Sequence, residues 1–185
     1  MNDLMSVGMH RLWKDKFVRE LKPFAGMQHL DVAGGTGDVA FRVLDQITQL
    51  EDEQQEQRAE RRPTQQSLTP KDWTLLRGML SPCPFQTEAH RVLKVGGRFL
   101  CLEFSHVTLP GLKQIYDAYS FNVIPEIGRT VANDKASYEY LVESIRKFPE
   151  QEAFASMIRA AGFSNVRYEN LQGGIVAIHS GFKLK

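Results

Sequence analysis

A glycine-rich turn between two acidic residues carries the clearest chemical signal in the sequence. The run from Leu30 to Asp38 reads Leu-Asp-Val-Ala-Gly-Gly-Thr-Gly-Asp, with an amphipathic helical pattern after it. Three glycines within four residues are unfavourable inside a strand or helix, because glycine loses the most conformational entropy there. They suit a sharp turn at which a ligand approaches bare backbone and amides at the following helix start hold its polar part. The sequence therefore predicts a nucleotide-type site in a strand–turn–helix unit.

Two ligands compete for this turn. Gly35-x-Gly37-x-x-Ala40 fits the dinucleotide fingerprint, which also needs an acid about 20 residues further on, at the end of a second strand. The acids near that distance lie in a glutamine-rich polar run with no strand pattern. Asp31-x-x-x-Gly35-x-Gly37 resembles the first motif of Rossmann-like methyltransferases, whose S-adenosylmethionine is a sulfonium cation without a pyrophosphate. Carboxylates at Asp31 and Asp38 suit that charge, so we favour S-adenosylmethionine over a nicotinamide dinucleotide or an ordinary turn.

Four residues are the predicted cofactor site. We expect Thr36 to contact the cofactor, with Gly35 and Gly37 allowing close backbone approach. Asp31 either orients the turn or touches the ligand. No metal-ligand spacing is present, and we predict no metal.

Length and composition limit the class of protein. A chain of 185 residues with a formal charge of +1 predicts one domain and favours neither nucleic acid nor a strongly anionic membrane as partner. Cys83 and Cys101 have neither metal nor disulfide spacing, which indicates a reducing compartment. No apolar run approaches the about 18 residues of a membrane-spanning helix. The N-terminus lacks an arginine- and serine-rich leader, so we expect no targeting segment in this chain.

The spacing of apolar residues predicts the helices and strands around the turn. Residues up to Leu21 read as a helix with an apolar stripe, and a second stripe follows the glycine turn. Residues 87–93 read as a short helix, 99–104 as a buried parallel strand with Glu103 at its carboxyl edge, and 110–119 and 133–148 as helices. A helix from Pro149 to Gly162 precedes two strands, 166–171 and 175–179, joined as a hairpin. The three predicted stripes are Leu12, Trp13, Phe17, Leu21; Ala40, Leu44, Ile47; and Leu112, Ile115, Tyr119.

Several long motifs resemble one family. They are residues 1–14, the turn at 31–38, the run 91–105 (Arg-Val-Leu-Lys-Val-Gly-Gly-Arg-Phe-Leu-Cys-Leu-Glu-Phe-Ser), and residues 138–149 and 174–182. These runs resemble the signatures of the ubiquinone/menaquinone-biosynthesis C-methyltransferases, and the polar run after the first turn resembles an insertion in their eukaryotic, mitochondrial members. The resemblance covers residues 1–48 and 88–185.

The resemblance implies a function. Members transfer a methyl group from S-adenosylmethionine to a ring carbon of a prenylated benzoquinol in ubiquinone biosynthesis. It also implies an assembly with other quinone-biosynthesis enzymes, peripheral association with the inner membrane and a place on its matrix face in mitochondria.

The middle of the chain departs from the family pattern. The family places three strands between the turn and residue 91, and each βαβ step needs about 30 residues. No stretch from 51 to 87 has the pattern of a buried strand closed by an acid, so the ribose-binding acid, the adenine loop and a substrate loop of the family are absent. The sheet must close up, borrow residues 73–80 or leave edges unpaired.

The predicted fold is accordingly a single α/β domain, residues 1–185, with a Rossmann-like methyltransferase fold, an incomplete central sheet and a C-terminal antiparallel hairpin. Residues 49–70 form a polar insertion, helical or disordered. The alternative to an active enzyme is an impaired or inactive variant that at most docks in the quinone-biosynthesis assembly.

The catalytic base is not identified. His106, Glu103 and Tyr116 lie near the predicted ligand edge, each with a structural role as the alternative. Residues 116–124, through Tyr116, Tyr119, Phe121 and Ile124, line either an apolar slot for a prenyl tail or a core-facing helix. His10 either touches substrate or caps its helix.

Overall fold

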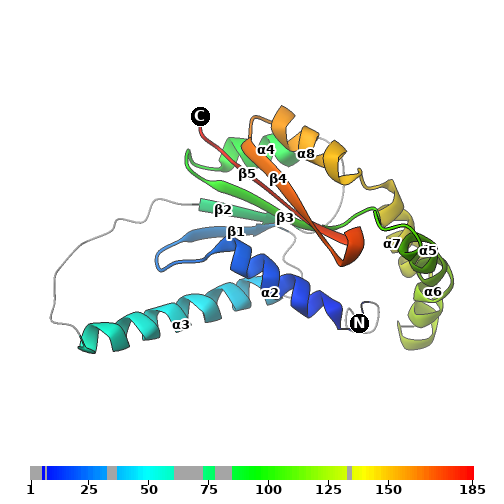
Figure 1. Cartoon of the computed structure of the whole chain (residues 1–185), viewed down its shortest axis with the longest axis horizontal. Coiled ribbons are helices and arrows are strands. Elements are labelled where there is room, and N and C mark those ends of the chain that lie inside the picture. The colour runs from blue at the N-terminus through cyan, green and yellow to red at the C-terminus, as the bar shows by residue number, and fades with distance from the viewer. Residues whose placement is uncertain (1–5, 7, 33–36, 61–72, 78–84, 133–134) are drawn as a thin grey trace.

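A five-stranded mixed sheet with helices on both faces forms the molecule, as the computed structural model shows (Figure 1). The structure describes residues 6, 8–32, 37–60, 73–77, 85–132 and 135–185. The strand order is β1-β2-β3-β5-β4. Strands β1, β2 and β3 are parallel, whereas β5 runs antiparallel to both β3 and β4. This arrangement confirms the predicted α/β fold with a closing antiparallel hairpin.

The elements have the following bounds. The strands are β1 (Gln28–Val32), β2 (Trp73–Arg77), β3 (Arg98–Phe104), β4 (Ser164–Leu171) and β5 (Val176–Phe182). The helices are α2 (Met9–Leu21), α3 (Asp38–Glu60), α4 (Phe85–Val92), α5 (Leu112–Asn122), α6 (Ile124–Ile127), α7 (Lys135–Lys147) and α8 (Gln151–Ala160). A π-helical turn, Gly128–Ala132, follows α6, and a 3-10 turn, Gln172–Gly174, joins β4 to β5.

Residues 73–77 form strand β2, which lies between β1 and β3 in the sheet. In the register of the sheet, Leu75 of β2 lies between Leu30 of β1 and Phe99 of β3. Of the three alternatives, borrowing is therefore the one that the chain adopts. β2 ends at Arg77 rather than at an acidic residue. The polar insertion is helical through Glu60 as part of α3, and residues 61–70 lie outside the described part of the chain.

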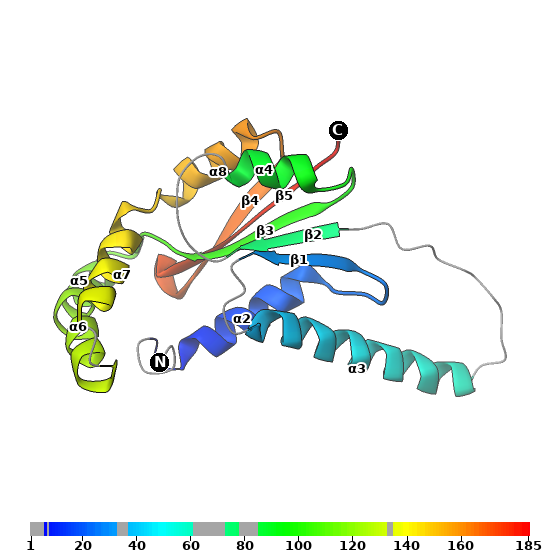
Figure 2. The same cartoon turned by 180° about the vertical axis from the view of Figure 1, so that it is seen from behind.

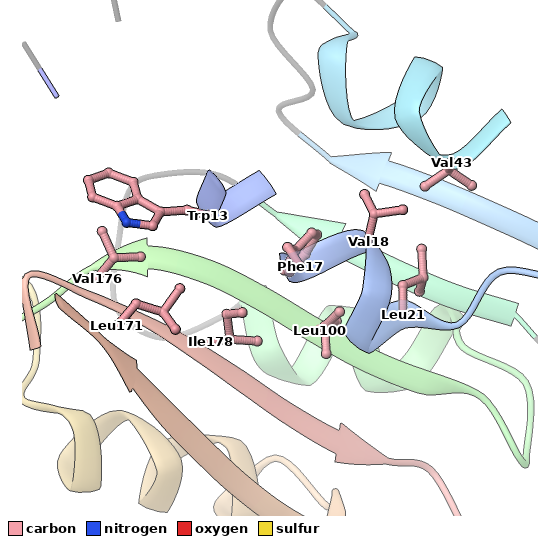
Figure 3. Packing of buried hydrophobic residues seen from close by; sticks show 9 residues of the cluster. All are labelled: Trp13, Phe17, Val18, Leu21, Val43, Leu100, Leu171, Val176 and Ile178. Atoms are coloured by element: carbon pink, nitrogen blue, oxygen red, sulfur yellow. The ribbon is translucent and has the colours of Figure 1, made fainter. Parts of the chain in front are cut away.

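Two apolar layers hold the sheet between its helices. Helices α2 and α3 cover one face, on which Phe17, Val18 and Leu21 pack with Leu100 and Ile178 (Figure 3). Helices α4 and α8 cover the other face, where a cluster gathers Ala89, Leu93, Phe99, Cys101, Phe154, Ile158 and Phe163. Strands β3 and β5 lie between both layers, which explains the continuous apolar run predicted as a buried strand.

Some predicted helix faces differ from those observed. Leu12 of α2, Leu44 of α3 and Ile115 of α5 are exposed. In α3 the side chains that reach the core are Val39, Val43 and Ile47, so Ile47 belongs to the predicted stripe, whereas Val39 and Val43 take the places of Ala40 and Leu44. Both stripes have helical spacing, and only the position of α2 beside α3 selects between them. No helix in the described part of the chain is long and apolar enough to cross a membrane.

Candidate functional site

The carboxyl ends of the parallel strands carry the candidate site. Asp31 lies near the end of β1, and Gly37 precedes α3 with a positive φ of 75°. A Cβ at Gly37 would lie 3.3 Å from the Phe41 ring, and an L side chain would be strained at this φ. Gly35 and Thr36 lie outside the described residues, so their predicted roles stay predictions.

Asp31 has an unsatisfied acceptor beside this turn. Its Oδ2 is buried and has no hydrogen-bond partner within the part of the chain that the structure describes. Burial raises the pKa of Asp31, whereas nearby His29 and Lys14 lower it. A buried acceptor without a donor is unfavourable unless a ligand or water supplies one. The position therefore fits a ligand that brings a positively charged or hydrogen-bond-donating group.

Asp38 plays a different part from the one predicted. Its Oδ2 accepts a hydrogen bond from Lys14 Nζ at 2.7 Å, and its Oδ1 accepts one from Arg42 Nε at 3.2 Å. The hydrogen bond from Lys14 is the main reason why the pKa of Asp38 is lowered. Arg42 also pairs with Asp15 of α2. Two cations already balance the Asp38 charge, so this carboxylate joins α2 to α3 rather than facing a sulfonium alone.

An apolar cavity of about 280 Å³ opens at the same end of the sheet. Phe104 ends β3, and Trp13 meets its ring edge to face, with ring centroids 5.9 Å apart. The cavity is lined by Ser6, Met9, Trp13, Phe104, Tyr116, Tyr119, Ile124, Leu141, Ile145, Gln172 and Ile175. Because β1 and β3 run parallel to β2, their ends meet at one edge, where open α/β sheets bind ligands.

Helix α5 contributes to this cavity largely as predicted. Tyr116 and Tyr119 line it, as does Ile124 from the start of α6. Phe121 is exposed instead, and the Arg146 guanidinium lies 4.9 Å from its ring centroid. Three of the four residues therefore line the cavity and Phe121 does not, since one helix cannot present positions 116, 119 and 121 on the same face.

Trp13 and Gln172 close the cavity from distant parts of the chain. The indole Nε1–H of Trp13 donates a hydrogen bond to Gln172 Oε1. Gln172 has a φ of 43°, a left-handed conformation that is uncommon outside glycine. Sequence reasoning treated Trp13 as core only and did not single out Gln172. Tryptophan, which carries a donor on an apolar ring, was the available signal.

The three candidate bases do not lie together at the cavity. His106 Nε2 bonds the carbonyl of Phe148 at 2.8 Å, and Glu103 is buried at the end of β3. Only Tyr116 lines the cavity, and burial raises the pKa of its phenol while Arg146 lowers it. Tyr116 is therefore protonated at neutral pH, which makes it a hydrogen-bond donor rather than a base.

His10 packs at the start of α2 and does not line the cavity. Its Nδ1 lies 2.9 Å from Ser6 Oγ, and its backbone N–H donates to the same oxygen at 3.3 Å. The Ser6 hydroxyl, rather than His10, therefore accepts a hydrogen bond from an amide of the first helical turn.

Comparison with known proteins supports this description. The fold resembles that of an S-adenosylmethionine-dependent methyltransferase from Thermotoga maritima, with a TM-score of 0.54 and 17% identity over 98% of this chain and 92% of that one. The chain is 49% identical over 230 aligned positions to the mitochondrial 2-methoxy-6-polyprenyl-1,4-benzoquinol methylase of Oryza sativa subsp. japonica, covering 100% of this chain and 78% of the relative. It is 46% identical to the ubiquinone/menaquinone biosynthesis C-methyltransferase UbiE of Dinoroseobacter shibae, covering 100% of this chain and 85% of that protein.

A family model confirms the predicted resemblance and its interruption. The model of the ubiE/COQ5 methyltransferase family matches residues 1–55 and 84–183. The 185 residues of the chain spread over 230 positions in the rice alignment, so at least 45 positions have no counterpart here. The unmatched residues between the two segments, 56–83, contain β2. The match on both sides of this break is extensive, and the chain is a member of the ubiE/COQ5 methyltransferase family.

Proposed function

We propose that the chain transfers the methyl group of S-adenosylmethionine to a ring carbon of a prenylated benzoquinol, a step of ubiquinone biosynthesis. The observation that carries this proposal is the apolar cavity at the carboxyl edge that also bears Asp31 and Gly37. An aromatic ring with an isoprenoid tail suits such a lining, because most of its surface is apolar.

Helix α2 connects the two halves of the proposed site. Trp13 faces the cavity, and Lys14, the next residue, holds Asp38 at the start of α3. A ligand on the turn and a substrate in the cavity are thereby fixed against the same helix. Such positioning is a large part of catalysis in group transfer, because it replaces a chance encounter with an oriented one.

The proposal gives roles to residues on both sides of the site. S-adenosylmethionine would be held by the 35–37 turn with Thr36, and by Asp31, and it supplies an electrophilic methyl group when bound. Asp31 would accept hydrogen bonds from the amino-acid end. In the cavity, Tyr116 would donate a hydrogen bond to a substrate oxygen, while Trp13 and Phe104 exclude water from the ring.

Location and partners follow from the same proposal. The relatives from rice and Arabidopsis thaliana are mitochondrial by name. We infer a mitochondrial location on the matrix face of the inner membrane, with peripheral association because the tail of the substrate is a lipid. Other enzymes of quinone biosynthesis would be partners in a multi-subunit assembly.

Cofactor binding and methyl transfer test the proposal separately. Calorimetric titration should show S-adenosylmethionine binding that Asp31→Asn weakens, because the amide lacks the carboxylate charge. Transfer of labelled methyl to a short-chain benzoquinol should fall in Tyr116→Phe, which removes one hydroxyl, and remain unchanged in the exposed control Tyr140→Phe. Absence of binding at millimolar ligand would reject the enzymatic proposal for this chain.

A second candidate function rests on the interrupted middle. At least 45 positions of the alignment with the rice relative have no counterpart here, and the family model leaves residues 56–83 unmatched, the region in which the resemblance expects the ribose and adenine contacts. A variant without those contacts would be impaired and would act at most as a docking partner in the assembly. This alternative predicts capture of pathway enzymes with no transfer of labelled methyl, and measurable turnover would exclude it.

A further inference from the structure

The turn between β4 and β5 lies at the mouth of the apolar cavity. Figure 2 shows the joined ends of β4 and β5 at the same end of the sheet as the start of α2 and helices α5 and α7, which supply other walls of the cavity. Gln172 of this turn lines the cavity and is also exposed, so its side chain lies at the opening. It is the only amide side chain among the lining residues that the structure describes.

The backbone of Gln172 has a conformation that glutamine rarely adopts. Its φ is 43°, and the two glycines that follow also have positive φ. The turn is fixed from its other side, because the Gly173 carbonyl accepts hydrogen bonds from the Thr108 N–H at 2.8 Å and from the Thr108 hydroxyl at 3.1 Å. Strained non-glycine residues of this kind concentrate at ligand sites. Glycine would adopt this φ without strain, so the turn alone gives no reason for a glutamine here.

The hydrogen bond to Trp13 fixes the orientation of the Gln172 amide. An indole N–H is a donor only, so the atom that meets Trp13 Nε1 is the carbonyl oxygen Oε1. The NH₂ group of the same amide has no hydrogen-bond partner in the described part of the chain. Because Trp13 also lines the cavity, this donor is held at the cavity mouth.

An oxygen on an aromatic ring is the partner that this donor fits. Apart from Gln172, the lining residues are apolar or carry a hydroxyl, as in Ser6, Tyr116 and Tyr119. Apolar walls hold a flat ring in several rotations, whereas hydrogen bonds to its oxygens select one of them. Tyr116 comes from α5 and Gln172 from the β4–β5 turn, so the two donors reach a bound ring from different elements.

We propose that the Gln172 amide N–H donates a hydrogen bond to a ring oxygen of the substrate and that Trp13 positions this donor. The inference rests on the proposed function, because it places a benzoquinol in the cavity. Gln172 is then a specificity-determining residue, which selects the rotation of the ring and so the carbon that faces the glycine turn. Trp13 acts through Gln172 and is a positioning residue.

Two ligands that differ only in their ring oxygens test the donor. Equilibrium dialysis under argon, without cofactor, gives the affinities for butylhydroquinone and butylbenzene. Gln172→Met keeps a long unbranched side chain but removes the amide, and it should weaken hydroquinone binding about three- to tenfold while butylbenzene binding is unchanged. Gln114→Met, at an exposed position of α5, is the matched control and should change neither affinity.

Two further variants separate this role from folding. Gln172→Gly accepts the positive φ without strain, so it should melt at or above the temperature of Gln172→Met and lose the same hydroquinone affinity. Trp13→Phe keeps an aromatic ring but releases the amide. It should therefore weaken hydroquinone binding in the parent chain and not in the Gln172→Met background. Circular dichroism supplies the melting temperatures.

The outcomes distinguish this inference from the proposed function. An equal loss of both ligands in Gln172→Met, or no loss of the hydroquinone, overturns the donor and leaves methyl transfer as proposed. Additive effects of Trp13→Phe and Gln172→Met overturn the positioning role of Trp13. A parent chain that binds neither ligand overturns both proposals. Discrimination between the ligands without any transfer of labelled methyl overturns the proposed function alone.

Discussion

Strands β3 and β5 and strand β1 belong to one sheet but have contrasting surroundings. Phe99, Leu100 and Ala177 have no exposed surface, because helices cover both faces of β3 and β5 and each of these strands has a neighbour on both sides. Among the described residues β1 has one neighbouring strand, and Leu30 is half exposed. An apolar side chain therefore contributes more to stability in β3 and β5 than in β1. The centre of the sheet holds the fold together, and β1 is its open edge.

The largest contrast should come from shortening one leucine in each region. Leu100→Ala removes a fully buried side chain from the cluster with Phe17 and Ile178 and should lower the free energy of unfolding by about 2–5 kcal/mol. Leu44→Ala, at an exposed site on α3, should change it by less than about 0.5 kcal/mol. Urea titration followed by circular dichroism measures both. Similar losses for the two variants would contradict the division into a buried half and an open edge.

Buried histidine makes the C-terminal half sensitive to acid. Burial lowers the pKa of His179 to about 4 from its ordinary 6.5, and only Nε2 has a partner, the Gln151 carbonyl at 3.0 Å. The unfolded chain binds this proton more tightly than the folded one. Stability is therefore complete above pH 6.5 and should decline by about 3 kcal/mol as the pH falls to 4.

Comparison of two histidine variants isolates this effect. His179→Gln should flatten the dependence of the unfolding free energy on pH between 6.5 and 4. His29→Gln, at the open edge, should flatten it less, because nearby Asp31 opposes the burial that lowers the pKa of His29. Denaturant titrations across that pH range supply the slopes. If the slope of the His179 variant matches that of the parent chain, the acid sensitivity lies elsewhere.

Glycine-to-alanine changes contrast a closed turn with an open one. Gly174 has a φ of 98°, and a Cβ there would lie 2.6 Å from the His106 carbonyl oxygen, so Gly174→Ala should destabilise by about 2–3 kcal/mol. At Gly37 the Cβ meets only a movable Phe41 ring at 3.3 Å, and Gly37→Ala should cost about 1–2 kcal/mol from backbone strain alone. Thermal melts rank the stability losses of the two variants. A larger loss for Gly37→Ala than for Gly174→Ala would contradict this prediction.

The smallest effect should come from the link between α2 and α3. Lys14→Met removes the 2.7 Å bond to Asp38, a partly exposed pair, and should reduce stability by at most about 1 kcal/mol. High salt should reduce the stability of the parent chain by a similar amount and that of the variant by less. A loss of several kcal/mol in the same denaturant titration would mean that this ion pair makes a major rather than a minor contribution to stability.

Sequence patterns predicted the C-terminal half more accurately than the N-terminal edge. The strand at 99–104, the helix that ends before Gly162 and the closing hairpin all form within a few residues of their expected bounds. These elements have neighbours on every side, so their pattern and their burial agree. In α3 the pattern allowed two faces, and only tertiary contacts with α2 exposed Leu44. A similar ambiguity misplaced Ile115 of α5.

The candidate site was predictable where chemistry is local. The glycine turn and Asp31 stood out by spacing, and the aromatic residues of α5 by their type. Gln172 was not predictable, because its role depends on Trp13 across 159 positions of the chain. The strand at Trp73–Arg77 was one of three alternatives, since a short apolar segment forms a strand only where neighbouring strands are free to pair with it.

The interior position of β5 has a consequence for biosynthesis. Arg98 of β3 lies beside Phe182 of β5, so this central pairing joins segments far apart in sequence. On the ribosome, β3 emerges long before its neighbour and exposes an apolar edge in the meantime. Such long-range pairing is intrinsically slow, because the entropy of closing the chain is lost before the contacts form.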